Sequence, residues 1–213
     1  MKKIIYDFGC HNGSNIFYYL LKAETVVAVD ANPELCKLIK LKFKKEIEQK
    51  RLIVENCIIT HETSGLEKSF YIFEPLDVCS TIYPETKLFY GDKRLKKSDY
   101  KEIKVVQKNI LEILDTYGAP YYIKIDLEHY DHVILNEIFS KYFKLVNGNF
   151  PKFVKYRIKD LKGLEIEHKF SDHSAGPCCE DIQGNWLEKD VFKKFFFLNG
   201  GPSWVDIHAM RSN

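Results

Sequence analysis

Short apolar runs that suit β-strands alternate along this chain with segments of helical periodicity, and no other feature constrains the fold as tightly. Residues 3–8, 25–30 and 121–126 are runs of this kind, rich in isoleucine, valine and tyrosine. Each is followed by a segment whose apolar residues recur at helical spacing. This order is typical of a parallel sheet with helices on both of its faces.

Other segments of the chain also have the patterns of helices and strands. We expect helices over 14–23, 32–50, 109–118 and 132–143, and further strands over 51–60, 68–75 and 152–158. Near the C-terminal end, strand-like runs flank the Asn-Gly-Gly-Pro turn at 199–202, which predicts a β-hairpin. The prediction is a Rossmann-like, doubly wound α/β fold, with a mostly parallel, seven-stranded sheet and a C-terminal antiparallel hairpin. The rest of residues 60–104 is expected to be loop.

Size and composition describe a globular protein. The 213 residues, 45% hydrophobic and 29% charged, fit a single domain spanning 1–213, which could also be one domain of a longer protein. No apolar run approaches the ~20 residues that cross a bilayer, so no membrane insertion is expected. A formal charge of +2 provides no overall basic field for nucleic acid. Six cysteines without a C-x-x-C pair fit a reducing, cytoplasmic setting.

The first strand-like run ends in a loop that carries two glycines. Gly9 and Gly13 can adopt positive φ and let a ligand approach the backbone, and the helix that follows offers free N–H groups. Asp30 ends the second run, where a carboxylate in a doubly wound fold accepts hydrogen bonds from the hydroxyls of a ribose. Together these residues predict a site for a nucleoside-containing cofactor.

The spacing in this loop bears on the identity of the cofactor. A dinucleotide fingerprint reads G-x-G-x-x-G, whereas this chain reads Asp7-x-Gly9-x-x-x-Gly13. An acid at Asp7 would repel a pyrophosphate but suit a cofactor with an ammonium and a sulfonium, which favours S-adenosylmethionine over NAD. Cys10 and His11 are interpreted as spacers whose backbone matters more than their side chains. The alternative is a pair of turn glycines and a capping aspartate in an unrelated α/β protein.

Longer stretches resemble a known family. "YDFGCHNGSN" and "VVAVDANPEL" resemble the first two motifs of class I S-adenosylmethionine-dependent methyltransferases. The run "ILEILDTYGAPYYIKIDLEHYDHVIL" is similar to the FkbM-type members, whose usual form is K-I-D-V-E-G-x-E followed by an apolar helix. "CSTI" occupies the place of their Ser-Ser-Leu element, and the resemblance covers roughly residues 3–160. It implies O-methylation of hydroxyls on sugars and related polyols.

The resemblance also assigns the cofactor site. It places Asp30 at the ribose and Asn32 near the adenine, with Asn56 and Cys57 flanking that ring. The methionine end would be lined by Asp7, Gly9, Asn12 and Gly13. This chain departs from the family at His129, which stands where the family has a glycine and puts the conformation of that loop in question.

Acidic and basic side chains gather where the 121–126 run ends. Lys124 and Asp126 share one face of the expected strand, so Asp126 would emerge near the reacting methyl group. We expect Asp126 or His129 to act as the base that removes the hydroxyl proton, and Glu128 to orient or bind the acceptor. Two alternatives stay open: magnesium held by Asp126 and Glu128, and a structural Lys124–Asp126 ion pair with Glu128 and His129 capping the next helix.

The sequence therefore predicts an S-adenosylmethionine-dependent O-methyltransferase whose acceptor is a hydroxyl of a sugar or glycan. The alternatives are a methyltransferase acting on a nucleic acid or an amine, and a non-catalytic nucleotide-binding partner domain. The sequence predicts neither the oligomeric state nor a metal requirement.

Overall fold

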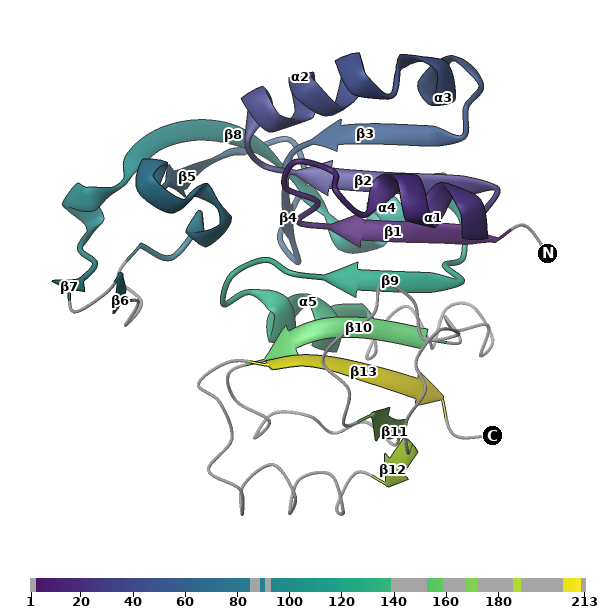
Figure 1. The fold of residues 1–213 in the computed structure, drawn as a ribbon. Coiled ribbons are helices and arrows are strands. Elements are labelled where there is room, and N and C mark those ends of the chain that lie inside the picture. The colour runs from purple at the N-terminus through teal and green to yellow at the C-terminus, as the bar shows by residue number, and fades with distance from the viewer. Residues whose placement is uncertain are drawn as a thin grey trace.

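We describe the protein from a computed structural model, in which the described residues are 3–84, 89–90, 93–138, 153–158, 168–171, 186–188 and 205–211 (Figure 1). No helix within these residues is long and apolar enough to cross a membrane.

A parallel sheet forms the centre of the molecule (Figure 1). The neighbouring strands β10, β9, β1, β2 and β3 all run parallel. Their bounds are Phe153–Ile158, Tyr122–Ile125, Ile4–Phe8, Thr25–Asp30 and Leu52–Asn56. The strands expected over 3–8, 25–30, 121–126 and 152–158 are thereby confirmed. Burial on both faces explains their continuous apolar character, since every residue of β1 and of β9 is buried.

The sheet continues on the β10 side with strands of mixed direction. β13 (Val205–Arg211) lies antiparallel to β10 and to β11 (His168–Ser171), and β12 (Trp186–Glu188) forms the edge. The sheet therefore has eight described strands, where seven were predicted. The predicted antiparallel strand near the C-terminus is present as β13. The other strand of the predicted hairpin, at 194–198, lies outside the described residues.

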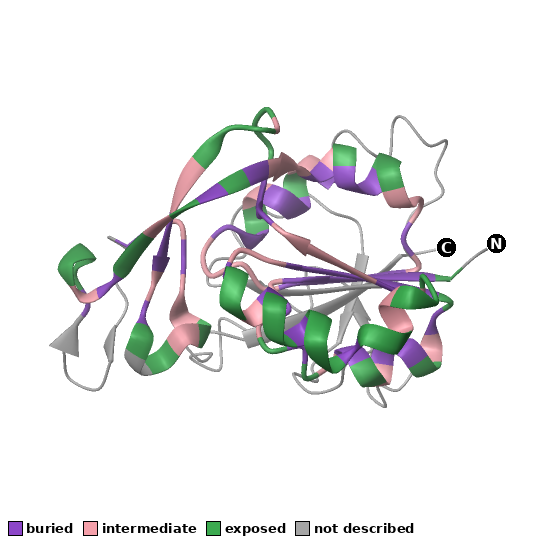
Figure 2. Ribbon diagram, turned by 90° about the horizontal axis from the view of Figure 1, so that it is seen from above, coloured by how far each residue is buried: buried purple, intermediate pink, exposed green. Residues whose placement is uncertain are grey.

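Helices cover both faces of the parallel strands. In β2, Val26 and Ala28 pack with α1 (Ile16–Lys22) and α2 (Pro33–Lys42). The alternate residues Val27 and Val29 pack with α4 (Ile110–Tyr117) and α5 (Asp131–Glu137) on the other face. Figure 2 shows how the buried residues line the inner sides of these helices. The doubly wound arrangement is confirmed for the described part of the chain.

Two predicted elements are each divided by a single buried residue. The helix expected over 32–50 ends at Phe43, whose φ of −112° and ψ of 32° are not helical, and α3 (Lys44–Glu48) follows. This break lets the Phe43 ring pack into the core beneath α1 and α2. The strand expected over 51–60 divides at Cys57, whose N–H donates to the Asp30 carbonyl, and the chain then leaves the main sheet as β4 (Ile58–Thr60).

The segment after β4 forms a second sheet of three strands. β4 pairs in parallel with β8 (Lys101–Asn109), which pairs antiparallel with β5 (Glu67–Ile72). Figure 1 shows this sheet curving away from the main one. The loop predicted for the rest of residues 60–104 is wrong from Lys101 on, where β8 begins, and no strand was predicted over 105–108. The strand forms because both of its edges are paired, while only Val105 and Gln107 along it are buried.

Short elements occupy the far end of this excursion. They are η1 (Glu74–Cys79), β6 (Phe89–Tyr90), β7 (Lys93–Arg94) and η2 (Lys97–Asp99). η1 is interrupted at Leu76, whose φ of −153° and ψ of 79° are not helical.

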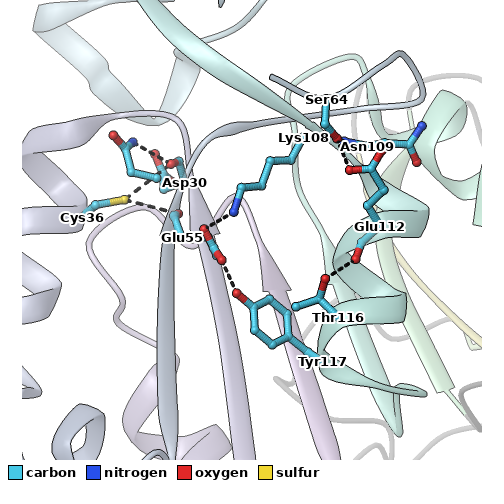
Figure 3. A network of polar contacts seen from close by, with 10 residues as sticks. Asp30, Cys36, Glu55, Ser64, Lys108, Asn109, Glu112, Thr116 and Tyr117 are labelled. Carbon is cyan, nitrogen blue, oxygen red and sulfur yellow. Dashed lines mark hydrogen bonds and ion pairs between the residues drawn. The ribbon is translucent and has the colours of Figure 1, made fainter. Parts of the chain in front are cut away.

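A polar network ties the two sheets to α4 (Figure 3). Glu55 of β3 accepts hydrogen bonds from Lys108 Nζ of β8, at 2.7 Å, and from the Tyr117 hydroxyl of α4. Burial raises the pKa of Glu55, but these two partners outweigh it and hold the pKa below the ordinary value. Glu112 of α4 accepts from Ser64 in the turn before β5. The second sheet is thereby held against the main one by hydrogen bonds between charged and polar side chains.

Replacing Lys108 by methionine should lower the free energy of unfolding by about 1 kcal/mol at neutral pH, because Glu55 loses its cation. The lowered pKa of Glu55 means that this contribution is present above the carboxyl's unfolded pKa and is lost as the pH falls through the folded one. The difference between variant and wild type should therefore shrink in acid, as measured by urea unfolding. Lys101→Met is the control, since the exposed Lys101–Glu74 pair at 3.8 Å contributes little. Equal losses in the two variants would contradict this account.

Candidate functional site

Three loops meet where the parallel strands β1, β2 and β9 end. Within the sheet β1 lies between β2 and β9, and Asp7 is paired in register with Ala28 on one side and Lys124 on the other. The chain leaves β1 toward β2 and β3 and later returns on the opposite side through β9 and β10. This reversal of strand order is the place where ligands bind in open α/β sheets.

The glycines of the first loop are needed for the packing of the chain itself. Gly9 and Gly13 have φ of +71° and +70°. A Cβ at Gly9 would lie 1.9 Å from the carbonyl oxygen of Asp126, and one at Gly13 would lie 2.8 Å from Ile16 Cδ1. Sequence reasoning expected these glycines to let a ligand approach. The positive φ expected at both glycines is confirmed, and the structure adds a further reason, close contact with the β9 loop and with the helices behind.

A buried lysine joins the ends of β1 and β9. Lys124 Nζ donates to the Gly9 carbonyl at 2.6 Å and lies 3.4 Å from Asp7 Oδ1 and 3.4 Å from Asp126 Oδ2. Asp7 is 0% exposed and Lys124 7%. Burial alone would lower the pKa of Lys124, but Asp7 and Asp126 outweigh it and raise the pKa above its ordinary value. The Lys124–Asp126 pair weighed from the sequence is therefore present, with Asp7 as a third member.

Asp30 is held by the backbone of two loops. Its Oδ2 accepts from the His11 N–H at 2.7 Å and its Oδ1 accepts from the Asn32 N–H at 2.8 Å. Burial raises the pKa of Asp30 to about 6, and the two backbone hydrogen bonds oppose that rise. Since a carboxylate offers about four acceptor positions, this half-buried group retains capacity for further hydroxyl donors.

The remaining predicted cofactor residues have structural roles of their own. Asn32 caps α2 by accepting from the Glu34 N–H at 3.1 Å. Asn56 Nδ2 donates to the carbonyls of Asp30 and Ala31 at 3.0 and 3.1 Å. Cys57 is buried, which raises the pKa of its thiol to about 12. All of them border the end of β2 and so shape the surroundings of Asp30.

Asn12 lies apart from this group. Its side chain is exposed, and its Oδ1 accepts from the Ser14 N–H at 3.0 Å, which closes the turn that leads into α1. The structure therefore brings Asp7 and Gly9 together with Lys124 and Asp126, but places the Asn12 side chain outside that contact.

The loop after β9 keeps a glycine-like shape without a glycine. Glu128 and His129 have φ of +44° and +80°, which L-residues seldom adopt. His129, which stands where the family has glycine, thus adopts the conformation a glycine would favour, at a cost of about 1–2 kcal/mol. Thr81 Oγ1 donates to the Glu128 carbonyl at 3.0 Å and helps to hold the loop. The backbone of this loop therefore has the conformation that a glycine would favour, although the sequence has His129 there.

Sequence reasoning gave no role to Asp131, the first residue of α5. It is 3% exposed, and its Oδ1 accepts from the Leu127 N–H at 3.2 Å. Burial, and after it the charge of Asp126, raise the pKa of Asp131 to about 8. A carboxyl that is largely protonated at pH 7 therefore stands behind Asp126. The sequence shows an acid at the position where the FkbM-type motif also has one, but it does not show that this acid is buried.

The His11 side chain was also missed. Its Nε2 lies 2.9 Å from Asp77 Oδ1 of η1, so it makes a specific contact beyond the role of a spacer. These residues are 66 positions apart, and no local pattern predicts such a contact.

The part of the chain that the structure describes contains no group of three or more His, Cys, Asp or Glu side chains that could hold a metal ion. The proposed magnesium ligand Asp126 has the Lys124 ammonium beside it.

Comparison with known proteins gives information about the fold. No protein-family model matches this sequence, and no curated protein matches it. Among solved structures, the methyltransferase FkbM from Methylobacillus flagellatus resembles it with a TM-score of 0.51 at 11% identity, over 99% of this chain and 43% of that one. The chain thus spans less than half the length of that protein.

Two further structures resemble this chain less. Precorrin-6Y C5,15-methyltransferase from Geobacter metallireducens has a TM-score of 0.40 at 12% identity, over 99% of this chain and 82% of that one. The C-terminal domain of the enzyme from Rhodobacter capsulatus has a TM-score of 0.43 at 7% identity, over 99% and 81%. Of these three structures, only FkbM has a TM-score above 0.5, so among them only its similarity bears on the fold. It confirms, at the level of the fold, the predicted resemblance to class I methyltransferases of the FkbM type.

Asp131→Asn removes the buried acid and keeps an oxygen for the Leu127 N–H. Because the folded pKa of about 8 lies above the unfolded one, the stability that Asp131 contributes is complete below the unfolded pKa and is lost as the pH rises toward the folded value. Relative to wild type, the variant should therefore gain up to about 4 kcal/mol in free energy of unfolding between about pH 5 and pH 8, where the gain levels off. Urea unfolding across that range tests this, with the exposed Asp115→Asn as control. A difference that stays constant with pH would contradict it.

Proposed function

We propose that this chain is an S-adenosylmethionine-dependent methyltransferase. The observation that carries the proposal is Asp30, a half-buried carboxylate that the N–H groups of His11 and Asn32 fix at the end of β2. It lies where the strand order reverses, in a fold shared with a methyltransferase. A carboxylate in that position suits the two hydroxyls of a ribose.

The charges beside Asp30 support this cofactor over a dinucleotide. Asp7, Lys124 and Asp126 together carry one net negative charge when all three are ionised, and they lie directly behind the Gly9 loop. A pyrophosphate would be repelled there, whereas an ammonium and a sulfonium would be attracted. In this proposal Gly9, Gly13 and Asn12 form the loop around the methionine end. Asn32, Asn56 and Cys57 form the surroundings of the adenine.

The cofactor supplies a methyl group on a sulfonium, and the chain's own residues hold the acceptor in line and remove its proton. We propose a sugar or glycan hydroxyl as the acceptor, with Asp126 or His129 as the base and Glu128 as the group that orients it. Such a base contributes ~10²–10⁴-fold to the rate. The positive φ of Glu128 and His129 supports this assignment, since strained backbone is often found at functional sites.

We propose that residues 1–213 act as one domain in the reducing cytoplasm, without insertion into a membrane. A nucleic-acid or amine acceptor and a non-catalytic nucleotide-binding role are the alternatives.

Calorimetry with S-adenosylhomocysteine tests the cofactor assignment. We expect the wild-type protein to bind, and Asp30→Asn to weaken binding about 10–100-fold, because hydrogen bonds to a charged group are lost. Asp115→Asn, on the exposed side of α4, should bind as wild type does. Absence of binding by the folded wild-type protein would refute the cofactor proposal.

A methyl-transfer assay tests the acceptor and the base. With a panel of sugars as acceptors, Asp126→Asn should lower kcat at least ~100-fold if Asp126 is the base, and His129→Gln should do so if His129 is. Transfer to oligonucleotides or amines in place of sugars would support the first alternative. An unchanged rate in both variants would show that neither residue is the base.

A further inference from the structure

A segment far from the first loop in sequence contacts both sides of the proposed site. We call residues 73–83, which follow β5 and include η1, the strap. It is anchored to the second sheet by Tyr71 and Thr81, which exchange backbone hydrogen bonds at 2.9 Å in each direction. It also packs on its own part of the chain, through Phe73 and Tyr100. Further contacts reach two loops of the main sheet, the one after β1 and the one after β9.

On the cofactor side, the strap contacts the loop through His11. Asp77 Oδ1 lies 2.9 Å from His11 Nε2, with side chains 42% and 30% exposed. His11 has a φ of +48°, and its own N–H is the donor to Asp30 Oδ2. A positive-φ residue persists only where its surroundings hold it. Asp77 therefore holds His11 in place, and the His11 backbone N–H in turn fixes Asp30, the carboxylate proposed to bind the ribose.

On the acceptor side, the strap contacts the loop after β9. Thr81, 1% exposed, donates from Oγ1 to the carbonyl of Glu128, itself a positive-φ residue. Tyr83 packs against Tyr130, with ring centroids 5.7 Å apart. Tyr130 also bonds His61 Nδ1 through its hydroxyl at 2.6 Å. The strap thus contacts one positive-φ residue in each loop, His11 after β1 and Glu128 after β9.

We propose that Asp77 is a positioning residue for the cofactor, and that through the strap it couples occupancy of the first loop to the order of the β9 loop. The inference rests on the proposed function for the identity of the ligand. The contact itself can be tested without any ligand. Because such coupling is reciprocal, a ligand bound at the first loop should stabilise the strap as much as the ordered strap favours that ligand.

The test uses two variants, of which one removes the contact and the other takes away its charge. His11→Asn cannot reach Asp77, yet asparagine tolerates the positive φ of this position. Asp77→Asn keeps the shape of the strap and removes its charge. Each should weaken binding of S-adenosylhomocysteine about two- to fivefold, the size expected of a partly exposed pair. The double variant should bind no more weakly than the weaker single one, because the two residues act through one contact.

Glu74→Gln is the matched control. It removes one negative charge from the same short helix, where Glu74 is paired only at 3.8 Å with the exposed Lys101. Its binding of S-adenosylhomocysteine should stay as in wild type. Multiplicative losses in the His11–Asp77 double variant, or an equal loss in Glu74→Gln, would overturn the proposal.

Hydrogen exchange gives the readout that a general loss of stability would not produce. Without ligand, amides of the strap should exchange faster in Asp77→Asn than in wild type, while those of β8 and α4 remain unchanged. S-adenosylhomocysteine should slow exchange in the strap of wild type, and should do so less in Asp77→Asn. If the strap exchanged equally fast in ligand-free wild type and ligand-free Asp77→Asn, the proposal that the His11–Asp77 contact orders the strap would be overturned. If the wild-type protein failed to bind, the proposed function would fall, and the ligand-free comparison would still decide on the contact.

Discussion

The ammonium of Lys124 is the interaction on which the rest of the proposed site depends. It lies between the carboxylates of Asp7 and Asp126 and donates to the Gly9 carbonyl, so one buried cation fixes β1, its loop and the end of β9. A buried charge is tolerated only when it is paired and hydrogen-bonded. Removing the ammonium would take the cation from two carboxylates, of which Asp7 is fully buried, a far larger cost than losing a surface pair. The same arrangement leaves one excess negative charge at the place where a cationic cofactor would lie.

Local pattern was enough to predict the parallel core, and contacts between distant segments account for what it missed. β1, β2 and β9 could be predicted because buried parallel strands read as unbroken apolar runs. The start of α2 was visible in Asn32 and Pro33, a cap followed by a first-turn proline. The breaks at Phe43 and Cys57 were not visible, because they depend on which core and which sheet these residues join. β8 was missed because its pairing partners, rather than its own side chains, make it a strand.

The candidate site divides in the same way. The loop, Asp30 and the acidic end of β9 were predicted, since turn glycines and strand-end acids are sequence features. The crowding behind Gly9, the burial of Asp131 and the contact between His11 and Asp77 were not. Each depends on two segments that only the folded chain brings together. The conformation of His129 shows the limit of motif reasoning most directly, because tertiary contacts hold this loop in a shape that its own sequence does not favour.

The paired ends of the second sheet have a consequence for how this protein can vary. The chain leaves the main sheet along β4 and returns along β8, and these strands are bonded side by side, with Thr60 opposite Asn109. Everything between them is a closed excursion whose entry and exit are fixed to each other. Lengthening its outer end by a few residues would add only a small entropic cost, since loop closure grows slowly with length. The fold thus separates the parallel sheet, which holds the Gly9–Gly13 loop, from an excursion whose outer end can change in length while its two ends stay paired.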